Sequence, residues 1–346
     1  MKKIRFALIG TSSVAPRHAE AIINSRNAKL VAVRSSSKER AESFAKRFGI
    51  EAYTDYKALL KRDDIDAVDI VTMNCTHADF GIQAALAGKH VLVEKPIDTS
   101  LEKADELIRM CKRNKVVLSV IFQRRFDKTT QKLKRMIEKG RFGKIFLVRA
   151  SSKKFRPQKY FDGWRGMKKY SGGGVLITHT IHVIDLLHYL VGPVSSVDGK
   201  IATSTHDTEN EDVGIGLLKF KNGALGVIEG TNSVCANTPD RIEIYGSRGS
   251  IVVEEGRLGP RITQFNFGNN SLKSRFYYLI LSKIQSLIPT RAGTFKAQIE
   301  NFAEAVIANK PLVVEAESAK KSLEIVLALY ESSKSGREKW LTETNS

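Results

Sequence analysis

The stretch that decides the fold is KIRFALIGTSSVA, residues 3–15. Its apolar run, broken by Arg5 and ending in glycine, predicts a buried strand over 3–10 followed by a helix from about residue 15 to 24. The turn between them is a degenerate form of the dinucleotide-binding fingerprint G-x-G-x-x-G/A, with Ser12 where the second glycine belongs. The N–H groups at such a helix start hold a diphosphate, and an ordinary strand–helix turn is the alternative. The expected cofactor loop consists of Gly10, Thr11, Ser12, Ser13, Val14 and Ala15.

Beyond this loop, buried strands alternate with helices as far as residue 122. Strands are predicted over 29–35, 65–72, 90–95 and 115–122, and helices over 37–48, 56–60, 77–89 and 101–114. This alternation is typical of a parallel sheet with right-handed crossovers, covered by helices on both faces. The fold class is therefore α/β, with an N-terminal Rossmann domain over residues 1–122, a doubly wound parallel sheet that binds NAD(P).

The pattern changes after residue 122. The predicted elements are a helix over 127–139, a strand over 144–152, a long apolar helix over 175–191, successive strands between 194 and 267, and helices over 294–309 and 316–334. Turn signals between the strands indicate hairpins, and the segment 269–293 receives no assignment. We expect residues 123–346 to form a C-terminal α+β domain with an open, mostly antiparallel sheet. This domain would bind the substrate and form a homodimer or homotetramer through its sheet.

Composition and charge narrow the class of protein. The 346 residues suit two globular domains, no apolar run reaches the roughly 20 residues that cross a bilayer, and three scattered cysteines fit reduced thiols better than disulfides or a zinc site. These features predict a cytoplasmic protein with no membrane partner and no metal.

The net charge of +19 fits nucleic-acid binding, an anionic ligand or a solvated surface. Because no nucleic-acid-binding motif accompanies the basic segment 149–169, no nucleic-acid partner is expected, and this segment favours an anionic small-molecule substrate.

The end of the second strand bears on the choice of cofactor. An acid is expected here when the ribose 2′-OH of NAD is bound, but residues 34–38 read RSSSK. A guanidinium can donate two parallel hydrogen bonds to phosphate oxygens, so the segment suits a 2′-phosphate and favours NADP over NAD. The alternative is that Arg34 is only a solvated side chain. The residues concerned are Arg34, Ser35, Ser36 and Lys38.

Lys95 is the first catalytic candidate. It follows the fourth predicted strand in the sequence Glu94-Lys95-Pro96, at the edge of a doubly wound sheet where ligands bind. A lysine there can exchange a proton with a carbinol oxygen while hydride moves at the adjacent carbon, and Pro96 can fix the turn through a cis bond. An ordinary surface lysine is the alternative.

The second candidate group lies on the long apolar helix, which follows three glycines at 172–174. Thr178, His182 and Asp185 are spaced at i, i+4 and i+7, which predicts a polar stripe on one face of an α-helix. Such a stripe is costly in an apolar helix unless it lines a site, so Thr178 and His182 are expected to bind substrate. The alternative is a set of internally hydrogen-bonded core residues.

Together these segments resemble the glucose-fructose oxidoreductase/inositol dehydrogenase/MocA (Gfo/Idh/MocA) family over nearly the whole chain. The matching segments are 72–96, 123–126, 141–145, 161–166, 172–187, 209–231 and 240–254. The resemblance implies that Lys95 exchanges the proton of the reacting hydroxyl and that His182 is the paired substrate-binding or proton-relay histidine. It also implies cofactor contacts from Thr72, Asn74, His77, Glu94, Lys95, Gln123, Trp164 and Arg165.

Three departures from the family pattern concern the site. The cofactor loop lacks two of the family's glycines, Thr178 stands where many members have Asp or Asn, and Phe295 stands where a histidine is frequent.

The expected activity is reversible hydride transfer between NAD(P) and a secondary alcohol or ketone of a sugar or nucleotide-sugar derivative. A non-catalytic NAD(P)-sensing regulator or binding protein on the same fold is the alternative.

Overall fold

The computed structural model describes residues 2–256, 259–268 and 291–341. The chain forms two compact units. The first unit comprises residues 1–126 and 292–320, and the second comprises 127–291 and 321–346. The chain thus leaves the first unit near the predicted boundary, but it returns for residues 292–320, which the sequence analysis places in the second domain. Most of the unassigned segment 269–293 lies outside the described residues.

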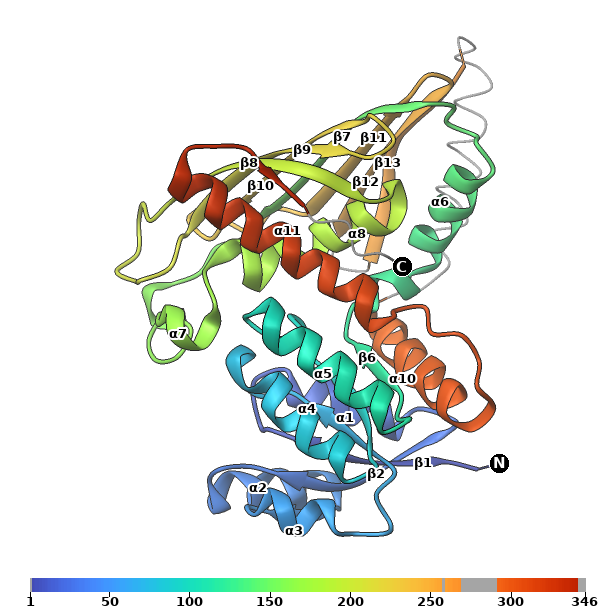
Figure 1. The fold of residues 1–346 in the computed structure, drawn as a ribbon, viewed down its shortest axis with the longest axis vertical. Coiled ribbons are helices and arrows are strands. Elements are labelled where there is room, and N and C mark those ends of the chain that lie inside the picture. Colours follow the sequence, from blue (N-terminus) through green and yellow to red (C-terminus); the bar gives the residue numbers. More distant parts are fainter. Residues whose placement is uncertain (1, 257–258, 269–290, 342–346) are drawn as a thin grey trace. The chain divides into compact units, whose positions relative to one another are not determined.

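The first unit is built on a six-stranded parallel sheet (Figure 1, blue to teal). Its strand order is β3-β2-β1-β4-β5-β6, the order of a Rossmann fold. The strands are β1 (Ile4–Ile9), β2 (Ala28–Arg34), β3 (Glu51–Tyr53), β4 (Ala67–Ile70), β5 (His90–Val93) and β6 (Leu118–Val120). The sequence analysis missed β3, because it has only three residues, none of them buried.

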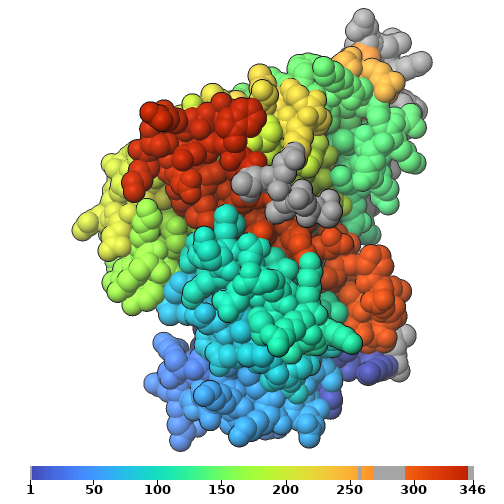
Figure 2. Space-filling view, viewed as in Figure 1, coloured from blue at the N-terminus to red at the C-terminus, as the bar shows by residue number. Residues whose placement is uncertain are grey.

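The helices of this unit begin and end at recognisable signals. They are α1 (Ala15–Ile23), α2 (Lys38–Phe48), α3 (Tyr56–Leu60), α4 (His77–Leu86), α5 (Leu101–Arg113) and α10 (Arg291–Ala308). Ser37 and Ser100 cap α2 and α5 by accepting backbone N–H groups, and α2 stops at Gly49 in the left-handed conformation. The outer sides of α4 and α5 form part of the surface seen in Figure 2 (cyan to teal). The core joins α10 to β1, with the rings of Phe302 and Phe6 5.7 Å apart.

The second unit contains an eight-stranded sheet ordered β13-β12-β11-β7-β10-β9-β8-β14. The strands are β7 (Ile145–Lys153), β8 (Val194–Ala202), β9 (Val213–Phe220), β10 (Leu225–Thr231), β11 (Asp240–Gly246), β12 (Gly249–Gly256), β13 (Gly259–Phe267) and β14 (Lys339–Trp340). Among the described strand pairs, β7 and β10 run parallel and the others antiparallel. The predicted fold class, a Rossmann sheet followed by a mostly antiparallel sheet, is confirmed.

Helices pack on one face of this second sheet. They are α6 (Lys128–Glu138), α8 (Ile181–Val191) and the later part of α11 (Ala316–Ser335). The short helix α7 (Lys168–Ser171) precedes α8 and lies away from the strands (Figure 1). The predicted helix 175–191 is present, but its first part, Leu176–Thr180, is a π-helix. The stretch Lys168–Val191 is long and apolar enough to cross a membrane, yet 78% of its most apolar window is buried inside the protein. Its helical part at residues 175–191 is therefore the core helix of this unit.

Candidate active site

The cofactor loop lies at the carboxyl end of β1, and its shape fits a dinucleotide. Gly10 has φ 111°, and a Cβ there would lie 2.8 Å from the Val71 carbonyl oxygen, so the position requires glycine. The hydroxyls of Thr11 and Ser35 are 3.0 Å apart and join the loop to the end of β2. The Ser12 Oγ is buried without a partner among the described residues. Because no side chain caps the start of α1, the loop offers polar groups suited to a diphosphate.

The segment after β2 places Arg34 against the protein itself. Its Nε donates to the Thr54 carbonyl oxygen at 3.0 Å, and its guanidinium lies 5.2 Å from the centre of the Phe80 ring. Ser36 is exposed and accepts a hydrogen bond from Arg40 at 3.2 Å. Lys38 is also exposed and lies 3.8 Å from Glu42. These two contacts fix the Arg34 side chain at the carboxyl edge of the parallel sheet, next to the cofactor loop.

Lys95 is half-buried in a turn that follows β5. The Lys95–Pro96 peptide is cis, as the sequence suggested. The Lys95 N–H donates to Oε2 of Glu94 at 2.9 Å, and Nδ1 of His77 lies 2.7 Å from the Pro96 carbonyl oxygen. Two residues after Pro96, Asp98 accepts the N–H groups of Ala78 and Thr99. Fixed contacts on both sides of the lysine therefore hold its turn in one conformation.

The residues expected to contact the cofactor from α4 and β6 lie at the same carboxyl edge of the parallel sheet. The Thr76 hydroxyl donates to that of Thr72 at 2.8 Å, and Asn74 is buried at the start of a 3₁₀ turn (Asn74–Thr76). Burial lowers the pKa of His77, whose Nδ1 and Nε2 lie 2.7 Å and 3.3 Å from the carbonyl oxygens of Pro96 and Thr72. Gln123 is half-buried at the start of another 3₁₀ turn, Gln123–Phe126. The first unit thus brings its predicted cofactor residues to one edge.

A buried histidine between two carboxylates was missed by the sequence analysis. His18 lies on α1, with Nδ1 2.8 Å from Asp69 of β4 and Nε2 3.1 Å from Glu94. Although burial opposes the charge, the two carboxylates raise the pKa of His18 to about 10. Burial also acts to raise the pKa of Glu94, but the His18 imidazolium lowers it overall. The histidine falls eight residues after Gly10 in sequence, and only the fold brings its two partners to it.

In the second unit, the glycine triplet lets Glu211 reach the start of the core helix. A Cβ on Gly174 would overlap the backbone of Glu211, and one on Gly173 would overlap the Tyr330 ring. The Glu211 carboxylate accepts the N–H groups of Gly174 and Leu176 and the Tyr330 hydroxyl, at 2.7, 3.0 and 2.8 Å. Burial nevertheless raises the pKa of Glu211. The sequence analysis missed this residue, because it lies in a strand-like segment far from the helix it caps.

The π-helix changes the predicted polar stripe. It adds one residue to a turn, so the α-helical spacing of Thr178, His182 and Asp185 no longer describes one face. Thr178 donates its hydroxyl to the Gly174 carbonyl oxygen at 2.6 Å. Asp185 is fully buried and accepts a hydrogen bond from Ser322 of α11 at 3.0 Å. Thr178 and His182 are both half-buried, whereas Asp185 belongs to the core.

Trp164 and Arg165 belong to a group of stacked rings and cations. The Arg165 guanidinium lies 4.6 Å from the Trp164 ring centre and 5.3 Å from that of Tyr160. Arg156 also lies 5.3 Å from the Tyr160 ring, and the Tyr160 hydroxyl is 3.3 Å from Nε2 of His179. The basic segment therefore includes two arginines ordered on an aromatic ring, next in sequence to the core helix.

The fold and the loop geometry define a Rossmann-fold, dinucleotide-binding enzyme with an added α+β domain. Two family descriptions match it: "Oxidoreductase family, NAD-binding Rossmann fold" over residues 4–122, and "Oxidoreductase family, C-terminal alpha/beta domain" over 134–342. The chain belongs to this oxidoreductase family, as the sequence resemblance indicated. The expected enzyme class, an oxidoreductase with an NAD-binding domain, is confirmed.

Individual relatives match the chain along nearly its full length. Myo-inositol 2-dehydrogenase of Thermotoga maritima is 30% identical over 342 residues, which is 97% of each chain. The crystal structure of the WlbA dehydrogenase of Bordetella pertussis, in complex with NADH and UDP-GlcNAcA, superposes with a TM-score of 0.88 at 28% identity and 99% coverage of both chains. A levoglucosan dehydrogenase in complex with NADH and levoglucosan has a TM-score of 0.88 at 25% identity, covering 99% of this chain and 100% of that one.

Proposed function

We propose that the protein transfers hydride between NAD(P) and a secondary alcohol or ketone of a sugar or nucleotide-sugar derivative. The observation that carries this proposal is the fixed turn of Lys95, which lies at the same sheet edge as the glycine loop after β1. The named substrates and ligands of the relatives support a polyhydroxylated ring: one acts on myo-inositol, one on levoglucosan, and one was solved with UDP-GlcNAcA.

In this proposal each residue has a distinct task. The loop Gly10–Ala15 and the start of α1 hold the diphosphate, and the nicotinamide supplies a hydride acceptor or donor when bound. The Lys95 amine takes the hydroxyl proton as the carbonyl forms and returns it in the reverse direction. His182 binds the substrate hydroxyl. Since Thr178 already donates its proton to Gly174, its hydroxyl can serve the substrate only as an acceptor.

The decisive experiment replaces Lys95. With inositols, levoglucosan and UDP-sugars as candidate substrates, Lys95→Ala should lose roughly 10²–10⁴-fold in kcat, the usual contribution of a proton-transfer group. Binding of NADH or NADPH, followed by fluorescence, should stay close to wild type. Lys103→Ala is the matched control, because Lys103 pairs with Asp79 on the surface. Wild-type turnover by Lys95→Ala would overturn the assignment.

We also propose that the substrate carries negative charge. Arg156 and Arg165, held on the Tyr160 ring, are the support for this, together with the UDP-GlcNAcA bound by the WlbA dehydrogenase. A guanidinium stacked on an aromatic face is held in one orientation, in which it can meet a carboxylate or a phosphate. The protein should turn over UDP-GlcNAcA with a higher kcat/KM than UDP-GlcNAc or myo-inositol. A preference for the uncharged inositol would count against this proposal.

For the cofactor, we propose a preference for NADP(H) over NAD(H). The segment after β2 has Arg34 and Ser36 and lacks an acid, and only Nε of the guanidinium donates to another described residue. Losing a charged phosphate contact should weaken NADPH binding by about 1.5–3 kcal/mol in Arg34→Ala. NADH binding should change little. Equal affinities for the two cofactors in the wild-type protein would contradict the preference.

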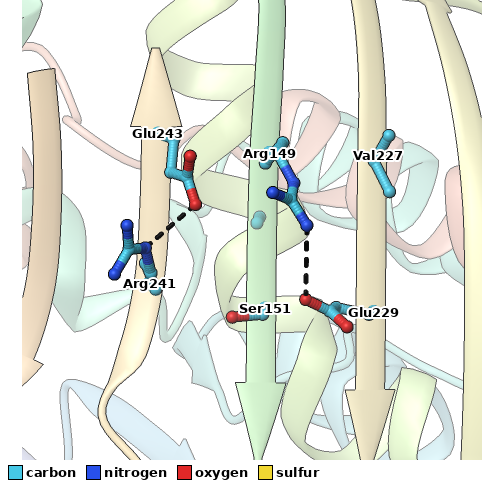
Figure 3. Close-up of a pocket in the computed structure, with 7 residues that line it drawn as sticks. Arg149, Ser151, Val227, Glu229, Arg241 and Glu243 are labelled. Atoms are coloured by element: carbon cyan, nitrogen blue, oxygen red, sulfur yellow. Dashed lines mark hydrogen bonds and ion pairs between the residues drawn. The ribbon is translucent and has the colours of Figure 1, made fainter.

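Finally, we propose that two copies associate through the uncovered face of the second sheet. Ile215, Leu217 and Leu225 point outward there and are 51%, 58% and 57% exposed. Beside them, Figure 3 shows a shallow charged depression in which Arg149 faces Glu229 and Arg241 faces Glu243. Light scattering should give a dimer or tetramer that Leu217→Glu dissociates. A monomeric wild type would refute this.

A further inference from the structure

The chemistry proposed above does not use His18 or Asp69, which form a buried group with Glu94. Both nitrogens of the His18 ring lie within hydrogen-bond distance of a carboxylate, at 2.8 Å and 3.1 Å. The side chains of His18 and Asp69 are fully buried and that of Glu94 is 11% exposed. An ionised carboxylate only accepts hydrogen bonds, so this arrangement requires a donor at each ring nitrogen. His18 is therefore an imidazolium between two anions.

The other oxygen of Glu94 reaches the lysine. Its Oε1 meets His18, while its Oε2 accepts the backbone N–H of Lys95 at 2.9 Å. The carboxylate thus joins α1, the helix that follows the cofactor loop, to the turn that carries Lys95. The edge of the Phe295 ring, from α10, lies against the His18 ring with centres 5.2 Å apart and keeps it from water. Without the imidazolium, a buried Glu94 would lose its charge partner and its fixed orientation.

We infer that His18 is a positioning residue for Lys95, acting through the Glu94 carboxylate. This inference rests on the proposed role of Lys95 in proton transfer. The hydrogen bond from Nε2 to Glu94 then affects turnover, whereas the bond from Nδ1 to Asp69 affects only stability. The two bonds can be tested separately, because a glutamine amide replaces the Nε2 donor and an asparagine amide replaces the Nδ1 donor.

The experiment compares His18→Gln with His18→Asn in the full-length enzyme. Each variant keeps one donor and loses the charge, so both should lower the melting temperature. His18→Asn loses the bond to Glu94 and should lower kcat by about tenfold or more, with KM and the Kd for the cofactor little changed. His18→Gln should keep kcat within about threefold of wild type. Hydrogen exchange of the Lys95 amide should be faster in His18→Asn than in His18→Gln.

Two further variants complete the test. His90→Asn is the control, because His90 lies at the opposite end of β5 and accepts the Val117 N–H; it should lower stability without changing kcat. If neither His18 variant folds, Glu94→Gln keeps the shape of the side chain and should show the same loss of kcat and the faster Lys95 amide exchange. A normal kcat in Glu94→Gln would then overturn the inference.

The outcomes separate this inference from the proposed function. If Lys95→Ala turns over normally, the role of Lys95 itself is wrong. If Lys95→Ala is inactive while His18→Asn matches His18→Gln in kcat and in Lys95 amide exchange, only the positioning role is overturned. Equal losses of stability in the two His18 variants, together with unequal turnover, would support it.

Discussion

Each unit buries a carboxylate beside a candidate catalytic segment, and the two carboxylates are stabilised differently. Glu94 faces the His18 imidazolium, and its pKa falls despite burial. Glu211 accepts three hydrogen bonds from neutral donors, and its pKa still rises because burial dominates. At Glu211 three neutral donors thus do not offset the cost of burying the charge, whereas at Glu94 the adjacent cation does.

The largest expected effect concerns Glu211, whose removal leaves three donors without an acceptor. Each unsatisfied buried donor costs about 1–3 kcal/mol, so Glu211→Ala should lower the free energy of unfolding by roughly 3–5 kcal/mol in a urea titration. The exposed neighbour Asp207 provides the control, since Asp207→Ala should stay within about 0.5 kcal/mol. A loss for Glu211→Ala no greater than that of the control would show that its hydrogen bonds are dispensable.

The charge of His18 should also make the stability of the protein depend on pH in the alkaline range. Because folding raises the pKa of His18 from 6.5 to about 10, its contribution to stability is complete below 6.5 and is lost as the pH rises through about 10. The free energy of unfolding of the wild type, measured from pH 6 to 10, should therefore fall relative to that of His18→Gln. Parallel curves for the two proteins would mean that His18 is not charged in the folded state.

A smaller effect should distinguish the two carboxylates in acid. Glu94 has a lowered pKa, so its contribution is present above the unfolded value of 4.5 and is lost as the pH falls. Glu211 has a raised pKa, so its folded state gains relative stability on acidification. The free energy of unfolding of each protein is measured from pH 7 down to pH 3. The difference between the wild type and Glu94→Gln should fall as the pH is lowered, and the difference between the wild type and Glu211→Gln should rise. Slopes of the same sign would remove the contrast between the two sites.

The smallest expected change is at Thr178. Thr178→Val removes one hydrogen bond to the Gly174 carbonyl oxygen and should cost about 1 kcal/mol or less. If the hydroxyl also accepts a bond from the substrate, KM should rise while kcat stays the same. Unchanged KM together with the stability loss would confine Thr178 to a structural role at the start of the core helix.

The sequence predicted what depends on local patterns and missed what depends on distant partners. The strand runs and the glycine turn at Gly10 depend on nearby residues, so the doubly wound parallel sheet could be inferred. The ion group of His18 needs residues 51 and 76 positions away, and Glu211 caps a helix that begins about 35 residues earlier. The π-helix also escaped prediction, because an extra residue in a turn leaves the apolar pattern of 175–191 intact.

The return of residues 292–320 to the first unit has a consequence for synthesis on the ribosome. The nucleotide-binding core takes Ile299, Phe302 and Ala303 from α10, near the end of the chain. When residue 126 emerges, that core still lacks these apolar side chains, and the Phe6 ring lacks its contact with Phe302. The N-terminal part therefore completes its packing only after most of the second unit has been translated, which reverses the usual order in which nascent domains mature.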